Sequence, residues 1–475
     1  MSDHRTVEAA ITTYDIAVIG AGSAGFSAAI TAADQGAKVA LIGHGTLGGT
    51  CVNVGCVPSK TMIRMAEALH GARTAERFAG IVGEAHVTDW RRVVADKDAL
   101  VTTLRNRKYR DLLPDYQNVT YLEGRARLTP SGVQVAAGEI TAAKVIITTG
   151  SSPALPDIPG LAHVPYLTST TALELTELPR SMMILGGGYI GCELAQMFAR
   201  AGVRVTLVTR RRLLPEAEPE VATALTGFFE QEGIMVRTGL SYQRVDKAGE
   251  GVSLEISVSG NRETLTADYL LLTTGRRPNS SGLGLEDAGI DLLANGGIVV
   301  DDHLRTSNPT VYAAGDVTGR DQYVYMAAYG AKLAALNALK GDSLAYDNSV
   351  MPWVVFTDPQ IAGVGLTEAA AKSAGLQTKT SLLPLDQLPR ALAARDMRGL
   401  IKLVADGATD RLLGAQIIAP EGADSIQTAV MAIRHGMTTR ELGEMIFPYL
   451  TTVEGLKLAA QGFGKDITKL SCCAG

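Results

Sequence analysis

Tyr14-Asp-Ile-Ala-Val-Ile19 runs directly into Gly20-Ala-Gly22-Ser-Ala-Gly25, and an Ala-rich stretch continues to Gly36. A short apolar run, a Gly-x-Gly-x-x-Gly turn and a helix form the first part of a dinucleotide-binding unit. The next apolar run, from Lys38 to Ile42, predicts the second strand of that unit. Because glycine has no Cβ, backbone N–H groups at the start of the helix can approach a pyrophosphate.

The same pattern returns later in the chain. Ser181-Met-Met-Ile-Leu185 leads into Gly186-Gly-Gly188-Tyr-Ile-Gly191, a predicted helix to Gly202 and a predicted strand from Val203 to Val208. Each unit is followed by an apolar strand that ends in Thr-Thr-Gly, at 145–150 and at 269–275. A single glycine motif is weak evidence, but two in this context predict two nucleotide-binding domains.

Composition is that of a soluble globular protein. The chain has 475 residues, of which 46% are hydrophobic and 20% charged, which predicts several domains with aliphatic cores. A net charge of -5 provides no basic surface for nucleic acid or for stable association with a membrane. Residues 16–33 are uncharged, but they are rich in Gly, Ala and Ser and are not predicted to span a membrane. The first residues have no secretory signal pattern, so we expect a cytoplasmic protein.

The rest of the chain predicts a return to the first domain and then a third domain. Thr310-Val-Tyr-Ala-Ala-Gly-Asp316 and the Ala-rich helix after it are expected to complete the first domain. From Val350 the pattern changes to strands such as 399–404 and helices such as 425–435, which is typical of an α+β domain. The expected segments are 14–150 and 276–346 for the first domain, 151–275 for the second and 347–475 for the third.

Four of the five cysteines form close pairs, Cys51 with Cys56 and Cys472 with Cys473. In a reducing compartment such pairs indicate redox or metal chemistry rather than structural disulfides. A thiolate at a helix N-terminus is stabilised by the helix dipole, which lowers the pKa of the thiol and makes it both a nucleophile and a ligand for soft metals. A zinc site is the rival interpretation, but no second Cys or His pair lies nearby at suitable spacing.

The segment Gly48-Gly-Thr50-Cys51-Val-Asn-Val-Gly-Cys56-Val-Pro-Ser-Lys60 resembles the redox-disulfide helix of the FAD-dependent pyridine nucleotide-disulfide oxidoreductases. This family includes glutathione reductase, lipoamide dehydrogenase and mercuric reductase. The resemblance implies a glutathione-reductase-like α/β fold with two Rossmann-like domains, for FAD and NADPH, and a C-terminal α+β dimerisation domain.

The resemblance also implies roles for individual residues. Cys56 would lie against the flavin as the charge-transfer thiolate, and Cys51 would be the interchange thiol. Tyr189 would cover the flavin until nicotinamide displaces it, and Lys60 and Glu193 would form a buried ion pair near the flavin N5. The predicted cofactor contacts are Gly20, Gly22, Gly25, Gly49, Thr50, Lys60, Thr149, Gly150, Gly186, Gly188, Gly191, Arg210, Arg211, Gly275 and Asp316, the last of which would hold the ribityl chain.

The residues after the second strand of each unit bear on the choice of nucleotide. Arg210-Arg211-Arg212 follow Val208 and Thr209, with no acidic residue for a ribose hydroxyl, and these cations favour the 2′-phosphate of NADPH over NADH. In the first unit, Gly43-His44 stands where an acidic residue is expected. The adenosine contacts at the first site are therefore left open.

Two departures at the C-terminal end bear on the substrate. Disulfide-reducing members of the family carry a proton-accepting His, whereas Phe447-Pro-Tyr449 places Tyr449 at that position. The chain also ends in Ser471-Cys472-Cys473-Ala-Gly475. Both departures resemble the mercuric reductases and imply Hg(II) thiolates as substrate. Cys472 and Cys473 of one subunit would then pass the metal to Cys51 and Cys56 of the other in a homodimer, where Tyr449 would line the site.

Other functions remain as alternatives. Some large thioredoxin reductases also use a C-terminal redox pair, but they keep the His that Tyr449 replaces. Lipoamide dehydrogenase would require both that His and an acidic residue for NADH. A protein that only sequesters a thiophilic metal or binds flavin is disfavoured by the complete second glycine motif.

Overall fold

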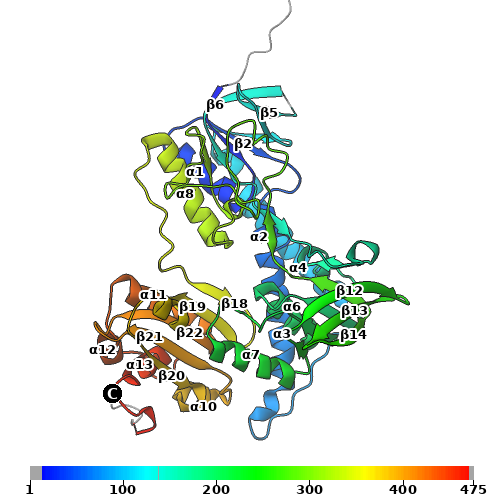
Figure 1. Ribbon diagram of the computed structural model, residues 1–475, viewed down its shortest axis with the longest axis vertical. Coiled ribbons are helices and arrows are strands. Elements are labelled where there is room, and N and C mark those ends of the chain that lie inside the picture. The colour runs from blue at the N-terminus through cyan, green and yellow to red at the C-terminus, as the bar shows by residue number, and fades with distance from the viewer. Residues whose placement is uncertain (1–12, 137, 470–475) are drawn as a thin grey trace, which may run out of the picture. The chain divides into compact units, whose positions relative to one another are not determined.

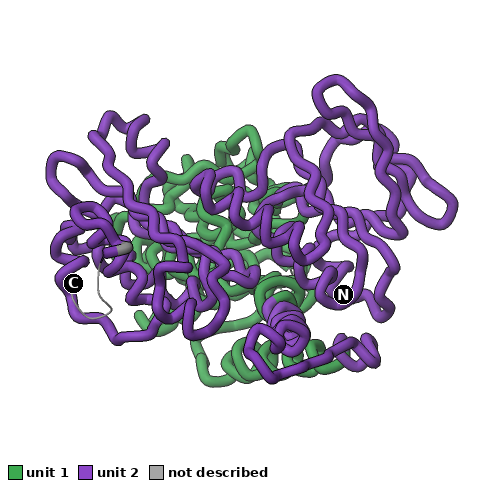
Figure 2. Tube along the Cα trace, turned by 90° about the horizontal axis from the view of Figure 1, so that it is seen from below, with its two compact units in different colours: residues 1–59, 95–154, 276–346 green, residues 60–94, 155–275, 347–475 purple. Residues whose placement is uncertain are grey.

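The structure is a computed structural model that describes residues 13–136 and 138–469, and it divides into two compact units (Figure 2). Unit 1 contains residues 1–59, 95–154 and 276–346, and unit 2 contains residues 60–94, 155–275 and 347–475. Among the described helices, none combines the length and the apolar character needed to cross a membrane.

Unit 1 is built on a seven-stranded sheet with the order β3-β2-β1-β6-β5-β4, and β17 pairs with β6 outside this path (Figure 1). Its strands are β1 (Thr13–Ile19), β2 (Val39–Gly43), β3 (Val119–Glu123), β4 (Arg127–Leu128), β5 (Val133–Val135), β6 (Gly138–Ile147) and β17 (Val311–Ala313). β1, β2, β3, β6 and β17 pair with one another in parallel, whereas β4, β5 and β6 form antiparallel pairs. The strand expected after Thr310 is therefore confirmed and lies in the same sheet as β1. A further pair, β7 (Ser151–Pro153) and β16 (Arg276–Pro278), is antiparallel.

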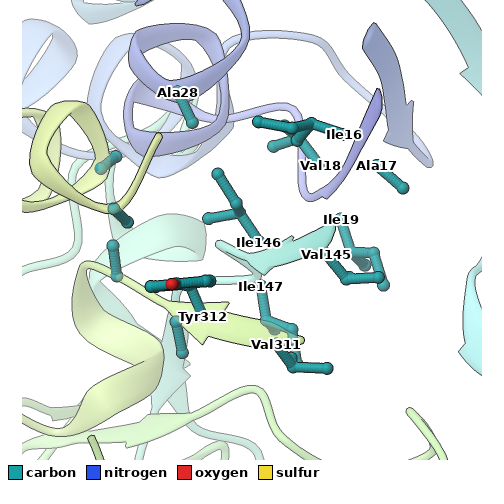
Figure 3. Close-up of a cluster of buried hydrophobic side chains, with 14 of the residues drawn as sticks. Ile16, Ala17, Val18, Ile19, Ala28, Val145, Ile146, Ile147, Val311 and Tyr312 are labelled. Carbon is teal, nitrogen blue, oxygen red and sulfur yellow. The ribbon is translucent and has the colours of Figure 1, made fainter. Parts of the chain in front are cut away.

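Small side chains allow the helices of unit 1 to pack closely. The helices that lie in or enter this unit are α1 (Ser23–Asp34), α2 (Gly49–Asn53), α3 (Cys56–Arg73), α4 (Trp90–Arg105) and α8 (Val324–Lys340). α1 packs along α8, and Ala28 and Ala331 are fully buried. Figure 3 shows the core beside them, where Ile146 of β6 lies between Val18 of β1 and Tyr312 of β17. The Ala-rich composition thus has a structural cause, because small residues let helix backbones approach.

Unit 2 contains a second parallel sheet, with the order β11-β10-β9-β15-β8. Its strands are β8 (Leu167–Thr168), β9 (Ser181–Leu185), β10 (Arg204–Val208), β11 (Met235–Arg237) and β15 (Tyr269–Leu272). The helices near it are α5 (Ser169–Ala172), α6 (Tyr189–Arg200) and α7 (Pro219–Gln231). An antiparallel meander of β12 (Ser241–Ala248), β13 (Gly251–Val258) and β14 (Asn261–Ala267) is inserted before β15.

A five-stranded antiparallel sheet completes unit 2, with the order β18-β19-β22-β21-β20. Its strands are β18 (Trp353–Val355), β19 (Gln360–Gly365), β20 (Thr378–Pro384), β21 (Leu400–Asp406) and β22 (Leu412–Ala419). The helices of this part are α9 (Glu368–Ser373), α10 (Pro389–Ala394), α11 (Gly422–Arg434), α12 (Thr439–Glu444) and α13 (Glu454–Gln461). α11 packs on β19 and β22, and α13 packs on β20 and β21, so the expected α+β character of this region is confirmed.

A buried lysine links β21 to the N-terminus of α7 and to α9 within unit 2. Lys402 of β21 donates hydrogen bonds from Nζ to Glu218 at 3.0 Å, Glu220 at 2.8 Å and Glu368 at 2.9 Å. Burial disfavours the lysine charge, but the three carboxylates more than offset this and raise the pKa of Lys402. Because Glu218 is only 3% exposed, its charge depends on this partner.

We expect Lys402→Met to lower the free energy of unfolding by about 3–5 kcal/mol, because it leaves Glu218 buried without its cation. Chemical denaturation of the cofactor-loaded protein, followed by circular dichroism, measures this loss. Arg91→Ala is the control: it breaks an exposed ion pair with Glu177 and should cost about 0.2–1 kcal/mol. Similar losses in the two variants would contradict this interpretation.

Candidate active site

The first and third glycines of each motif are required by close backbone packing. Gly20 and Gly186 have φ of +119° and +115°, and a Cβ on either would lie 2.4 Å from a carbonyl oxygen, that of Thr148 or Thr273 respectively. A Cβ on Gly25 would lie 1.7 Å from the Gly20 oxygen. Gly191 repeats this arrangement at 1.9 Å from the Gly186 oxygen. The two motifs therefore share one backbone geometry that other residues could not adopt without rearrangement.

The middle glycines have a different role. Gly22 and Gly188 are the N-caps of α1 and α6, with extended backbones and no side-chain hydrogen bond to the helix end. A Cβ on Gly188 would meet no atom within 4 Å, and one on Gly22 would approach only backbone atoms of Gly49, the nearest at 3.4 Å. The space beside each helix N-terminus is left open, as approach of a pyrophosphate to the N–H groups requires.

The Thr-Thr-Gly repeats stabilise the two glycine turns by equivalent hydrogen bonds. Thr148 donates a hydrogen bond from Oγ1 to the Gly20 oxygen at 3.1 Å, and Thr273 donates one to the Gly186 oxygen at 3.0 Å. The adjacent predicted residue Thr149 donates to the Asn279 oxygen at 2.7 Å. Both repeats end in a glycine with positive φ, Gly150 at +71° and Gly275 at +119°.

The segment 48–60, here called the redox segment, differs from the single helix that the resemblance implies. Cys51 lies in the short helix α2, whereas Cys56 is the first residue of α3, and both cysteines are half-buried. Gly55 lies between the helices, where a Cβ would come within 2.9 Å of the Thr50 oxygen. Cys56 thus lies at a helix N-terminus, and the helix that contains Cys51 ends before it.

The redox segment packs against the first glycine motif. Gly48 donates its N–H to the Ala21 oxygen at 2.9 Å. Gly49 has φ of +65°, and a Cβ there would lie 2.7 Å from the Gly22 Cα. Both contacts are within unit 1, so α2 is held beside the N-terminus of α1, while the predicted contact residue Thr50 is exposed.

Tyr109 is a neighbour of the cysteines that the sequence does not indicate. It lies in a π-helical turn, Asn106–Arg110, and its hydroxyl shares a hydrogen bond with the Ser23 hydroxyl at 3.0 Å. Burial raises the pKa of Tyr109, and negative charge on Cys51 and Cys56 adds to this rise. The tyrosine is surrounded by Arg, Lys and Asn in the sequence, a pattern typical of a solvated surface, and no motif marks it.

Asp316 is held by a network within unit 1. Ser151 donates a hydrogen bond to the Asp316 carboxylate at 2.6 Å, and Arg276 donates to the Ser151 hydroxyl at 2.7 Å. Burial lowers the pKa of Arg276, whereas negative charge on Asp316 and Cys56 opposes this effect. The sequence predicted Asp316, but not that Ser151 and Arg276 orient it.

The predicted ion pair between Lys60 and Glu193 is present in unit 2. Lys60 Nζ donates to Glu193 Oε2 at 2.6 Å, and the Glu193 side chain is only 6% exposed. The second oxygen, Oε1, accepts the backbone N–H of Phe356 at 2.9 Å. Tyr189 lies one turn before Glu193 in α6, where its ring stacks on that of Trp353. The neighbouring Cys192 is fully buried, which raises its pKa and makes it a packed hydrophobe rather than a reactant.

The remaining predicted residues lie at the surface or outside the described residues. Arg210 is exposed at the end of β10, and Arg211 pairs with Glu216 at 3.1 Å. Tyr449 is 48% exposed in the loop between α12 and α13. Cys472 and Cys473 lie outside the described residues. Within 13–136 and 138–469, no cluster of three or more His, Cys, Asp or Glu side chains is arranged to hold a metal.

Comparison with known proteins agrees with this geometry. Residues 14–335 match the pyridine nucleotide-disulphide oxidoreductase family, and residues 351–460 match its dimerisation domain. The chain belongs to the pyridine nucleotide-disulphide oxidoreductase family. As a member of this family it is an oxidoreductase that uses a flavin and a pyridine nucleotide, and the two open helix N-termini at Gly22 and Gly188 fit two such cofactors.

Several relatives in the family are mercuric reductases. The mercuric reductase of Streptomyces lividans is 46% identical over 98% of this chain and 99% of its own length. That of Bacillus cereus is 46% identical over 97% of this chain and 73% of its own length. Among solved structures, the Cu(II) complex of the HOCl-induced flavoprotein disulfide reductase RclA of Escherichia coli has a TM-score of 0.85 and 31% identity, over 96% of this chain and 100% of that chain.

We expect Gly188→Ala to raise the KM for the pyridine nucleotide at least tenfold and to leave flavin content unchanged. The protein itself has room for the new methyl group, so the loss would come from obstruction of the phosphate contact at the N-terminus of α6. Steady-state kinetics and the flavin absorbance measure the two effects. Gly227→Ala in α7, where a Cβ also meets no atom within 4 Å, is the control, and an equal effect there would contradict the assignment.

Proposed function

We propose that this protein is a mercuric reductase that uses NADPH and FAD to reduce Hg(II) to Hg(0). The observation that carries the proposal is the thiol pair, with Cys56 at the N-terminus of α3, in a chain 46% identical to a mercuric reductase along nearly the full length of both. A soft cation with high thiolate affinity suits a site that offers two sulfur ligands.

The two motifs would divide the cofactors between them. The motif at Gly20, together with Asp316, would hold FAD, and the motif at Gly186 would hold NADPH. Arg210 supports NADPH over NADH, because it is an exposed cation at the end of β10, where NADH-binding proteins place an acidic residue. The proposed domains are 14–150 with 276–346 for FAD, 151–275 for NADPH and 347–475 for dimerisation.

The proposed reaction converts NADPH and Hg(II) into NADP⁺, H⁺ and Hg(0). The bound cofactors supply its redox chemistry, a hydride from the nicotinamide and transfer of two electrons through the flavin. Cys51 and Cys56 bind Hg(II) as thiolates and release the neutral metal, which has little affinity for thiolate. Tyr189 would cover the flavin until the nicotinamide displaces it, and Glu193 positions the Lys60 ammonium by a hydrogen bond of 2.6 Å.

The dimer would supply the entry path for the metal. Cys472 and Cys473 in the tail of one subunit would take Hg(II) from small thiols and pass it to Cys51 and Cys56 of the other, and the partner subunit's Tyr449 would line that site. In this chain Tyr449 is presented by a loop in which the Leu450 N–H donates to the buried Glu454 at 3.2 Å. Hg(II) thiolates formed inside the cell would be the substrate, so the proposed location is the cytoplasm.

A thioredoxin reductase-like activity is the second candidate. It is favoured by the adjacent cysteines at the chain end, which could serve as a redox relay. Tyr449 argues against it, because a tyrosine hydroxyl lacks the near-neutral pKa of the imidazole that accepts a proton in disulfide reduction.

We expect Cys56→Ala to abolish the long-wavelength charge-transfer absorbance of the two-electron-reduced protein, because this band needs a thiolate against the flavin. Cys51→Ala should instead show the band before any reductant is added, since Cys56 then has no partner for a disulfide, and two electrons should remove the band because they reduce the flavin itself. Both variants should lose Hg(II) reduction. Anaerobic titration with dithionite, followed by absorbance, gives the result, and retention of the band in Cys56→Ala would overturn the assignment.

A further inference from the structure

An aromatic stack lies beside the proposed nicotinamide path. The Tyr189 ring, at the start of α6, stacks on the indole of Trp353 in β18, with ring centroids 5.6 Å apart and planes 18° apart. Both residues belong to unit 2, both are half-buried, and both pack against the same apolar core. Stacked aromatic pairs of this kind shift an equilibrium by about 2- to 10-fold.

The neighbouring strand provides the space for this indole. Gly363 of β19 is the cross-strand partner of Trp353 in the antiparallel sheet. A Cβ on Gly363 would lie 2.4 Å from Cζ2 and 2.5 Å from Cε2 of the indole. The backbone at Gly363 does not have a positive φ, so its own conformation would admit other residues. The absence of a side chain at this position therefore leaves the space that the indole ring occupies.

The strand that carries Trp353 is fixed to the helix that carries Tyr189. Phe356, three residues after Trp353, donates its N–H to Glu193 at 2.9 Å, and Glu193 lies one turn after Tyr189 in α6. Tyr189 and Glu193 thus contact the same short segment of chain. This hydrogen bond holds the backbone near Trp353 to α6, so the strand that carries the indole could shift away from α6 only by breaking it.

We propose that Trp353 is a positioning residue that holds the Tyr189 ring in place and so opposes its displacement by the nicotinamide. The inference rests on the proposed function, in which Tyr189 must move for hydride transfer. Any movement of the phenol ring from its place breaks the stack, and part of the binding free energy of the nucleotide is then spent on breaking it.

The test compares Trp353→Ala and Trp353→Phe with the wild-type holoenzyme. Rapid mixing with NADPH under anaerobic conditions gives the nucleotide concentration for half-maximal rate of flavin reduction, without any mercury. We expect Trp353→Ala to lower this concentration about 2- to 10-fold with little change in the maximal rate, and Trp353→Phe to lie between it and the wild type. An unchanged or raised concentration would overturn the proposal.

A second variant moves the indole without removing it. Gly363→Ala should shift the ring away from Tyr189 and change the half-maximal concentration in the same direction as Trp353→Ala, whereas Gly227→Ala should leave it unchanged. No shift in Gly363→Ala at normal flavin content would count against the proposal. If NADPH reduces the flavin of the wild-type protein but the protein does not reduce Hg(II), the proposed function is contradicted and the proposal for Trp353 is not.

Spectroscopy gives a readout that packing alone would not change. The chain has two tryptophans, so Trp90→Phe leaves Trp353 as the single indole. We expect binding of NADP⁺, which neither absorbs at the indole emission nor reduces the flavin, to alter the Trp353 emission in this variant, because the phenol ring moves away from the indole. Tyr189→Phe should preserve this response and Tyr189→Ala should remove it. Emission that responds equally in the Tyr189→Ala background would overturn the proposal.

Discussion

The buried carboxylate of Glu193 is the contact on which the proposed nicotinamide site of this protein depends. It accepts hydrogen bonds from the Lys60 ammonium and from the Phe356 N–H, and it thereby joins α3, α6 and the end of β18. A carboxylate that is 6% exposed needs such partners, since an uncompensated buried charge is strongly destabilising. Tyr189 lies in α6 and Trp353 in β18, and the hydrogen bond from Phe356 to Glu193 holds these two elements together.

Residues set by local backbone geometry could be predicted from the sequence. Gly20 and Gly186 were recognisable because a turn with positive φ and a carbonyl oxygen 2.4 Å from any Cβ admits only glycine. The strand–turn–helix pattern around them predicted β1, β9 and their helices within a few residues. Comparison with known proteins confirms the family and its mixed α/β fold. Both could be predicted because these constraints act within short stretches of sequence.

Residues that act through long-range contacts could not be predicted in this way. Tyr109 reaches the redox segment through a π-helical turn, and Arg276 reaches Asp316 through Ser151, 125 residues earlier in the chain. The stack of Trp353 on Tyr189 depends on a glycine in the neighbouring strand. The break between α2 and α3 likewise differs from the single helix that the resemblance implies. A sequence motif shows which residues a local backbone conformation requires. The contacts of Tyr109, Arg276 and Trp353 depend instead on which distant segments the fold brings together.

The most direct test of the proposed function is NADPH consumption by the purified holoenzyme in excess thiol, with and without Hg(II). Oxidised glutathione and thioredoxin serve as parallel acceptors, and volatile mercury is measured in the gas phase. We expect NADPH oxidation that depends on Hg(II) and releases one Hg(0) per NADPH. Oxidation only with a disulfide acceptor would contradict it, and would make the C-terminal cysteines a redox relay rather than a path for the metal.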